Sequence, residues 1–230
     1  MSDILEQQQA YYRARSAEYD QWWERQGRYD QGTERNQQWQ IEGQIVRDTL
    51  HQLPAQNHIL ELACGTGIWT KELVKLGQSI TAVDASAEML AINQAKVQSD
   101  RVTYIQADLF TWQSEQQFDM IFFGFWLSHV PSDKLQAFLQ GVSQMLKPNG
   151  YLFIIDSQRN QTATAKNQNM LDESPIHTRI LNDGREFQII KVFYDRDELQ
   201  SELAQVNIDA DVRLTNEFFI YAHGQKVIRS

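Results

Sequence analysis

The sequence predicts an α/β fold: a doubly wound, Rossmann-like, mostly parallel seven-stranded sheet with helices on both faces, preceded by an N-terminal helical lid. Two observations lead to this prediction. Apolar runs of strand length alternate with helical segments, and acidic residues stand at or just after the ends of several runs, as at Asp84, Asp108 and Asp156. Strands that alternate with helices are joined by right-handed crossovers, which make the sheet parallel.

Each element follows from a local signal. Residues 1–40 are polar with aromatic side chains at helical spacing, which predicts a helical arm, and an apolar face predicts a second helix over residues 40–53. That face consists of Ile41, Ile45, Val46 and Leu50. Ser86 has the residue type of a helix N-cap, and residues 182–184 carry the Asp-Gly signal of a hairpin turn. The remaining elements are strands at 58–62, 79–83, 102–106, 118–123 and 151–155, helices at 68–76, 86–97 and 132–146, a turn at 147–150, a hairpin at 178–193, a helix at 197–204 and closing strands at 211–214 and 218–222.

Composition restricts the possible partners. The 230 residues include 21 Lys and Arg and 30 Asp and Glu, a formal net charge of −9, which disfavours nucleic acid as a partner. Cys64, the single cysteine, has no partner for an internal disulfide, and no apolar run approaches the roughly 18 residues of a membrane span. No targeting leader is recognised, and the five histidines are not at metal-ligand spacing. We therefore expect a soluble, cytoplasmic protein without a metal site.

The residues that follow the strands predict a binding site for adenosine. Ligands of open α/β sheets bind beyond the carboxyl ends of the strands. Gly65 and Gly67 allow a tight turn close to a ligand, Asp84 suits the ribose hydroxyls, and Asp108 with Leu109 suits the adenine base. The alternatives are a purely structural turn, a helix N-terminal acid at Asp84 and a surface acid at Asp108.

The order of four segments resembles that of the motifs of class I S-adenosylmethionine-dependent methyltransferases. Residues 59–67, 82–86, 106–109 and 118–121 read ILELACGTG, AVDAS, QADL and FDMI, and residues 146–151, LKPNGY, resemble the turn before that family's fifth strand. The resemblance covers about residues 57–156. It implies S-adenosylmethionine (SAM) as the methyl donor, S-adenosylhomocysteine (SAH) as the product, and a small-molecule methyl acceptor.

The resemblance also implies roles for individual residues. Glu61 would lie near the amino group of the methionine moiety, Asp84 at the ribose, and Asp108 at the adenine. The full set of expected cofactor-binding residues is Tyr11, Tyr19, Glu61, Ala63, Gly65, Gly67, Asp84, Ala85, Met89, Asp108, Leu109, Phe123 and Gly124. The expected substrate-binding residues are Tyr12, Arg15, Trp22, Phe125 and Trp126. For the aromatic residues of the arm, simple packing on the core is an equally weighted alternative.

Three further features have a chemical and a structural interpretation. His129 is the candidate catalytic residue, a general base for the acceptor, and the alternative is an imidazole hydrogen-bonded into its loop. Cys64 is expected to be a packed thiol and not a nucleophile. Arg179, Arg185 and Lys191 of the predicted hairpin could meet an anion, but a solvated face is the favoured interpretation.

The sequence thus predicts a SAM-dependent methyltransferase that acts on O, N or C of a small metabolite. Two alternatives remain open: an NAD-dependent oxidoreductase, disfavoured by the missing third glycine, and a non-catalytic adenosine-binding module. We expect one domain over residues 1–230, with a lid at 1–40, a cofactor-binding core at 41–156, and a substrate-covering hairpin with closing strands at 157–230. A monomer and a homodimer are equally compatible with the sequence.

Overall fold

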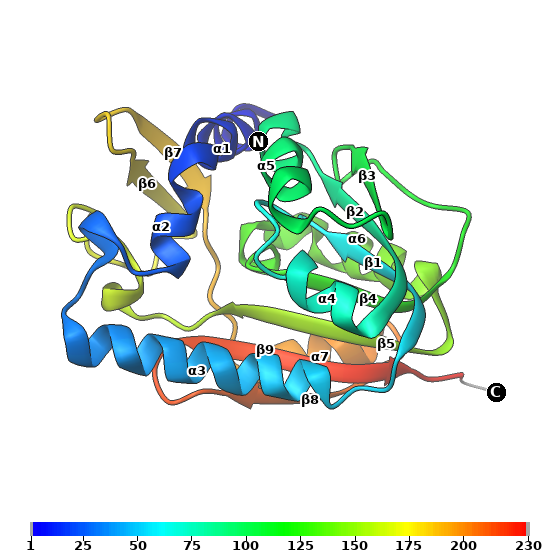
Figure 1. Cartoon of the computed structure of the whole chain (residues 1–230). Coiled ribbons are helices and arrows are strands. Elements are labelled where there is room, and N and C mark those ends of the chain that lie inside the picture. Colours follow the sequence, from blue (N-terminus) through cyan, green and yellow to red (C-terminus); the bar gives the residue numbers. More distant parts are fainter. Residues whose placement is uncertain (1, 229–230) are drawn as a thin grey trace.

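The computed structural model describes residues 2–228, and its centre is a seven-stranded sheet (Figure 1). The strands are β1 (Gln56–Leu62), β2 (Gly77–Asp84), β3 (Val102–Gln106), β4 (Phe118–Gly124), β5 (Leu146–Ser157), β8 (Ile208–Leu214) and β9 (Phe219–Lys226). Their order across the sheet is β3-β2-β1-β4-β5-β9-β8. The first five strands pair in parallel, whereas β9 is antiparallel to both β5 and β8. The predicted fold class is therefore confirmed.

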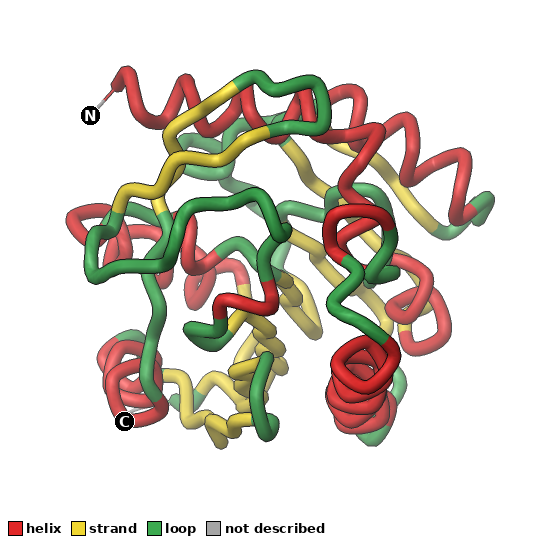
Figure 2. The backbone as a smooth tube through the Cα atoms, turned by 90° about the vertical axis from the view of Figure 1, so that its left-hand side faces the viewer, coloured by secondary structure: helices red, strands yellow, loops and turns green. Residues whose placement is uncertain are grey.

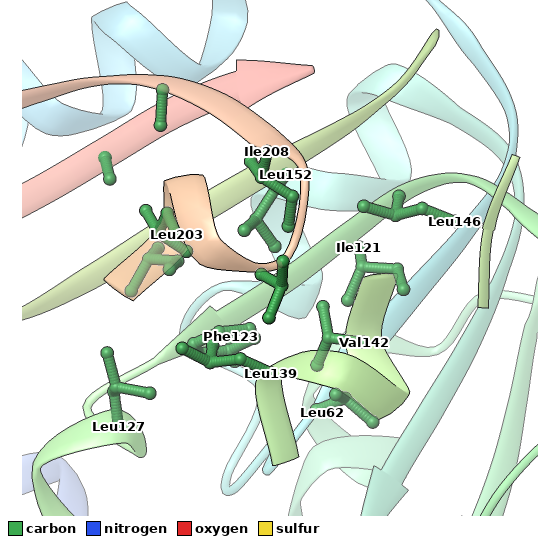
Figure 3. Close-up of a cluster of buried hydrophobic side chains, with 14 of the residues drawn as sticks. Leu62, Ile121, Phe123, Leu127, Leu139, Val142, Leu146, Leu152, Leu203 and Ile208 are labelled. Atoms are coloured by element: carbon green, nitrogen blue, oxygen red, sulfur yellow. The ribbon is translucent and has the colours of Figure 1, made fainter. Parts of the chain in front are cut away.

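Helices cover both faces of the sheet. They are α1 (Ser2–Arg15), α2 (Tyr19–Trp23), α3 (Thr33–His51), α4 (Thr70–Leu76), α5 (Ala87–Val97), α6 (Ser132–Met145) and α7 (Arg196–Gln205). One face packs aliphatic side chains of the sheet against α6 and α7, including Leu139, Val142 and Leu203 (Figure 3). The opposite face packs a mainly aromatic cluster against α3 and α4. No helix within residues 2–228 is long and apolar enough to cross a membrane.

The predicted second helix differs from α3 in its start and in its buried face. The helix begins at Thr33, and Ile41 and Ile45 are 56% and 45% exposed. The buried residues of the helix are Val46 and Leu50, as predicted, together with Trp39, Glu42, Gly43 and Thr49. The predicted face was therefore right for Val46 and Leu50 and wrong for Ile41 and Ile45. The missing side chain at position 43 leaves room for the Trp23 ring, 3.2 Å from where a Cβ would stand.

The predicted turn at residues 147–150 is part of β5. The strand begins at Leu146, and its pairing with β4 shifts register between Phe118 and Met120. Asn149 lies in the left-handed region at φ +60°, so the chain bends within the ladder. The turn residues therefore mark an irregularity inside a strand and not a break between two elements.

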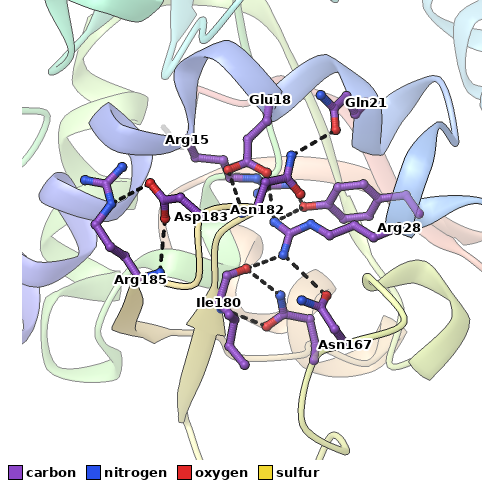
Figure 4. A network of polar contacts seen from close by, with 11 residues as sticks. Arg15, Glu18, Gln21, Arg28, Asn167, Ile180, Asn182, Asp183 and Arg185 are labelled. Carbon is purple, nitrogen blue, oxygen red and sulfur yellow. Dashed lines mark hydrogen bonds and ion pairs between the residues drawn. The ribbon is translucent and has the colours of Figure 1, made fainter.

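A hairpin and the N-terminal arm lie together above the sheet (Figure 2). The hairpin consists of β6 (Ile176–Ile180) and β7 (Glu186–Ile190), which form a separate two-stranded sheet, and α1 packs along β7. It is tied to the arm by polar contacts: Glu18 accepts from the backbone N–H of Asn182 at 3.2 Å, and Arg28 donates to the carbonyl of Ile180 (Figure 4). We call α1, α2 and the β6–β7 hairpin the cover.

Candidate functional site

The principal pocket lies where the strand order reverses, beyond the carboxyl ends of β1, β2 and β4. β1 pairs with β2 on one side and with β4 on the other, so the chain crosses over in opposite directions from this point. This first pocket has about 810 Å³ of space, including the open space at its mouth. Its walls come from the ends of β1 to β4 below and from α1 above, which supplies Leu5, Gln8, Gln9, Tyr12 and Arg13.

The glycine loop after β1 is held in an unusual backbone conformation. Ala63, Gly65 and Gly67 all have positive φ, at +53°, +51° and +87°. The buried Asn93 amide fixes the loop by donating to the carbonyl oxygens of Cys64 and Gly65, each at 3.3 Å. A Cβ on Gly67 would stand 2.6 Å from Asn93 Oδ1, so only glycine fits there. The loop therefore presents its backbone to the pocket in one defined shape.

Asp84 lies at the end of β2 and lines the first pocket. Its Oδ2 accepts from the backbone N–H of Gly65 and its Oδ1 from that of Ser86, both at 2.9 Å. Ser86 in turn caps α5 by accepting from the backbone N–H of Met89, as predicted. Burial raises the pKa of Asp84 despite these bonds. The carboxylate is thus oriented by backbone donors and keeps further lone pairs for a ligand.

Asp108, which follows β3, lines the same pocket. Its Oδ1 accepts from the backbone N–H of Phe110 at 2.9 Å, and its Oδ2 accepts from the side chain of Gln9 at 3.3 Å. Leu109 and Met89 are both buried and provide apolar surface beside it. This combination of a carboxylate and apolar walls suits a planar base with an exocyclic amine.

Glu61 closes a smaller inner pocket next to the first. Its side chain is 1% exposed and accepts a 2.6 Å hydrogen bond from the hydroxyl of Thr70. Burial raises the pKa of this carboxyl to about 8. Tyr19, Gly65 and Phe125 line the same pocket. A buried carboxyl of this kind is ready to ionise when a positively charged group binds beside it.

A second pocket of about 630 Å³ extends under the cover. It shares four residues with the first pocket, namely Tyr12, Tyr19, Phe125 and His129. Phe125 has φ +57°, a strained conformation for a bulky residue. Its ring packs edge-on against the ring of Trp22, with the two ring centroids 4.7 Å apart. The two pockets are therefore neighbouring compartments with one common wall.

His129 is held at that wall by two short hydrogen bonds. Its Nδ1 donates to the carbonyl of Ile190 at 2.6 Å, and its Nε2 accepts from the hydroxyl of Tyr12 at 2.6 Å. Gln8 adds a bond to the His129 carbonyl at 3.1 Å. Burial lowers the pKa of the imidazole to about 3, and the positive charge of Lys191 adds to this effect. At pH 7 the ring is neutral and its one lone pair is occupied by Tyr12.

The structure places most predicted site residues around these pockets. The first pocket is lined by Tyr19, Ala63, Gly65, Asp84, Ala85, Met89, Asp108, Leu109 and Gly124, the inner one by Glu61, and the second by Tyr11, Arg15 and Trp22. Tyr12 and Phe125 line both main pockets and Trp126 the first. Gly67 and Phe123 line none of the three, because Gly67 shapes the loop and Phe123 is fully buried in the sheet core.

Some site residues were missed or misjudged by sequence reasoning. Gln8 and Gln9 carry no local signal, since their position depends on how the arm folds back. Arg179 and Lys191 were expected on a solvated face, yet each is 8% exposed in the second pocket. The reason is that α1 covers this face of the hairpin. Arg185 does lie in solvent, paired with Asp183 at 2.8 Å.

Two minor predictions concern reactive groups. Cys64 is a buried thiol with its pKa raised by burial, so it is packed as expected. Within residues 2–228 there is no cluster of three or more His, Cys, Asp or Glu side chains able to hold a metal ion.

Comparisons with known proteins agree with this geometry. A family model described as a methyltransferase domain matches residues 59–150. Two solved structures, a DhpI–SAH complex and a DhpI–SAM–HEP complex, are 31% and 32% identical, with TM-scores of 0.80 and 0.81. The first alignment covers 100% of both chains, and the second covers 97% of this chain and 98% of the other.

Curated relatives match over a shorter stretch. An uncharacterized methyltransferase of Synechocystis is 31% identical over 49% of this chain and 56% of its own length. A demethylmenaquinone methyltransferase of Lactiplantibacillus plantarum is 33% identical over 56% of this chain and 54% of its own length. The chain thus spans about half the length of these curated relatives. With the strand order, the glycine loop and the two carboxylates that follow it, these likenesses show that the chain belongs to the class I SAM-dependent methyltransferases.

Proposed function

We propose that this protein transfers the methyl group of SAM to an oxygen, nitrogen or carbon atom of a small molecule. The observation that carries the proposal is the common wall of the two pockets, formed by Tyr12, Tyr19, Phe125 and His129. Methyl transfer requires a donor and an acceptor that are recognised separately and meet at one point. Two compartments that share a single wall meet this requirement.

The first and inner pockets fit the parts of SAM. Asp84 would accept from the ribose hydroxyls, Asp108 would accept from the adenine amine, and Glu61 would face the amino group of the methionine moiety. When bound, SAM supplies a methyl group on a positively charged sulfur, which is already activated for transfer. Little covalent chemistry is left to the protein, whose residues orient both molecules and exclude water.

The residues of the common wall would provide that environment. Tyr19 and Phe125 place aromatic rings where the two pockets meet, and aromatic faces attract a positive charge. The cover closes the second pocket from above, so the acceptor must be small enough to lie beneath it.

The alternatives are less well supported. An NAD-dependent oxidoreductase would need a phosphate-binding loop, but Thr70 stands where a third glycine is required. Relatives named after quinone biosynthesis, such as the ubiquinone O-methyltransferase of Coxiella burnetii, match over only 44% of their length. We therefore do not extend a quinone substrate to this chain. A non-catalytic adenosine-binding module would bind SAM without turnover.

Calorimetric titration with SAM, SAH and NAD tests the proposal. We expect micromolar binding of SAM and SAH, at least tenfold weaker in Asp84→Ala because the ribose loses a charged hydrogen-bond acceptor. Asp100→Ala, at an exposed acid outside the pockets, is the matched control and should bind like the original protein. Binding of NAD alone would contradict the proposal. Transfer of a labelled methyl group from SAM into a mixture of small metabolites then distinguishes an enzyme from a binding module.

A further inference from the structure

The second pocket gathers positive charge inside an acidic protein. Arg15 from α1, Arg179 from β6 and Lys191 after β7 line it, and each is 8% exposed. None of the residues that line this pocket is an Asp or a Glu. The whole chain carries a formal charge of −9, so this concentration of buried cations is opposite in sign to the rest of the molecule.

Internal partners neutralise only one of the three cations. Lys191 Nζ lies 3.1 Å from Asp156 Oδ1 and donates to the hydroxyl of Ser128 at 2.7 Å. Arg15 has no carboxylate partner and donates only to the hydroxyl of Tyr29, at 3.2 Å. The guanidinium of Arg179 has neither an ion-pair nor a hydrogen-bond partner among residues 2–228.

Neighbouring groups do not remove the imbalance. Glu18, which lies between α1 and α2, pairs with Arg28 at 3.0 Å and is thus already neutralised. Aromatic rings surround the Arg15 guanidinium, with its carbon 4.7 Å from the centroid of Tyr19, and they stabilise a cation only modestly. Burial lowers the pKa of Arg179, and the charge of Arg15 lowers it further. Two buried guanidiniums without a counter-charge are costly unless a ligand supplies one.

We propose that Arg15 and Arg179 form a subsite for an oxyanion, a carboxylate or a phosphoryl group, carried by the methyl acceptor. The proposal rests on the proposed function, because it assigns the second pocket to the acceptor. The planar fork of a guanidinium matches the oxygens of both anions and favours two parallel hydrogen bonds. The carboxylate of SAM is not the intended ligand, since Arg15 and Arg179 line neither the first nor the inner pocket.

Three small probes of similar size test the charge requirement: butyrate, butyl phosphate and butyramide. Each is titrated calorimetrically into the protein saturated with SAH, and again without SAH. We expect at least one of the two anions to bind tenfold or more tightly than the neutral amide. The comparison of butyrate with butyl phosphate then identifies which oxyanion fits. Equal binding of the amide and of both anions would overturn the proposal.

Paired variants test the residues. Arg179→Gln should weaken anion binding at least tenfold and leave the SAH affinity unchanged. Arg185→Gln lies on the same hairpin but in solvent, so it should leave both affinities unchanged. Anion binding that survives in Arg179→Gln would overturn the assignment. Loss of the subsite with SAH binding intact leaves the proposed function standing, whereas absence of SAH binding in the original protein contradicts the function itself.

A stability measurement guards against a folding defect in the variant. Removing an unpaired buried charge should leave the melting temperature of ligand-free Arg179→Gln equal to or above that of the original protein. The tighter-binding anion should raise the melting temperature of the original protein but not that of Arg179→Gln. A lower melting temperature of the ligand-free variant would show that Arg179 has a structural counter-charge, which contradicts the proposal.

Discussion

Glu61 is completely buried, and its protonation state depends on the charge of the group beside it. Its carboxyl accepts one hydrogen bond from Thr70 and has no cationic partner within residues 2–228. Burial raises its pKa to about 8, so the group is mostly protonated in the ligand-free protein at pH 7. A carboxyl whose pKa is raised in the folded state stabilises the protein most at a pH below the ordinary pKa of the group. This contribution is lost as the pH rises through about 8.

Binding of SAM should therefore release a proton. The amino group and sulfur of SAM are positive, so the carboxylate form of Glu61 is favoured in the complex and its pKa falls. Calorimetry at pH 7 in buffers with different ionisation enthalpies should show up to about one proton released per site. The nearly isosteric Glu61→Gln should release none. Buffer-independent heats in the original protein would show that Glu61 does not face the donor.

His129 should remain neutral over the whole physiological range. The pKa of the imidazole is lowered to about 3, and its hydrogen bonds to Ile190 and Tyr12 define one tautomer. A depressed pKa means that the stability from the neutral ring is present above the ordinary histidine pKa and is lost as the pH falls toward 3. Nitrogen NMR should show one histidine whose tautomer persists to pH 4, and His129→Gln should remove that signal. Titration of the same signal near pH 6.5 would contradict this prediction.

Part of the site could be predicted from single residues. Glu61, Asp84 and Asp108 were recognisable because each has a fixed place in or just after a strand, and the carboxyl ends of parallel strands meet at one edge. The burial of Arg179 was not recognisable. A cation in a hairpin is usually solvated, and only the arm packed on that hairpin makes this one different.

The glycine loop and α5 form one unit at the scale of elements. Asn93 of α5 donates to two carbonyls of the loop, and to the hydroxyl of Thr70 at 2.8 Å. It therefore joins the loop to α5. The shape that the ligand meets therefore depends on an amide from another element. Gly67 is the position where the two are in closest contact.

Gly67→Ala should damage both stability and binding. The new Cβ would stand 2.6 Å from Asn93 Oδ1 in a backbone at φ +87°, so the free energy of unfolding should fall by about 1–3 kcal/mol. SAH binding should weaken with it, because the loop has to shift. Gly141→Ala is the matched control: it lies within α6 with no atom near its Cβ and should stabilise the protein by up to about 1 kcal/mol. Urea unfolding and SAH titration of both variants check this, and equal effects would refute it.

Turns and caps could be predicted from the sequence where a local backbone hydrogen bond or turn geometry determines them. The Asp-Gly turn and the Ser86 cap were predictable because they depend on a few neighbouring residues. The buried face of α3 was only partly predictable. Trp39 and Gly43 belong to it because both pack against Trp23, which lies in another helix. Local signals thus determine a cap or a turn, whereas the face that a helix buries depends on its packing partners.

At the scale of the whole molecule, the two pockets are built from segments distant in the sequence. The arm and the hairpin are separated by about 150 residues, yet Gln8 accepts from the backbone N–H of Ile190 at 3.0 Å and donates to the carbonyl of His129. The second pocket therefore exists only when the arm, the hairpin and the loop after β4 are assembled. No local sequence pattern encodes this assembly. The fold could therefore be predicted from the sequence, but the second pocket could not.

This assembly predicts that the cover responds to the donor as one body. Because α1 lines the first pocket and Gln8 joins it to both β7 and His129, bound SAH should stabilise the arm and the hairpin together. Hydrogen exchange should slow by similar factors in α1 and in β6–β7, and remain unchanged in α7, which packs on β8 away from the pockets. In Gln8→Ala the slowing should persist in α1 but decrease in the hairpin. If SAH slowed exchange in α1 alone in the original protein, the hairpin would be an independent element, and the acceptor could enter beneath it with the donor already in place.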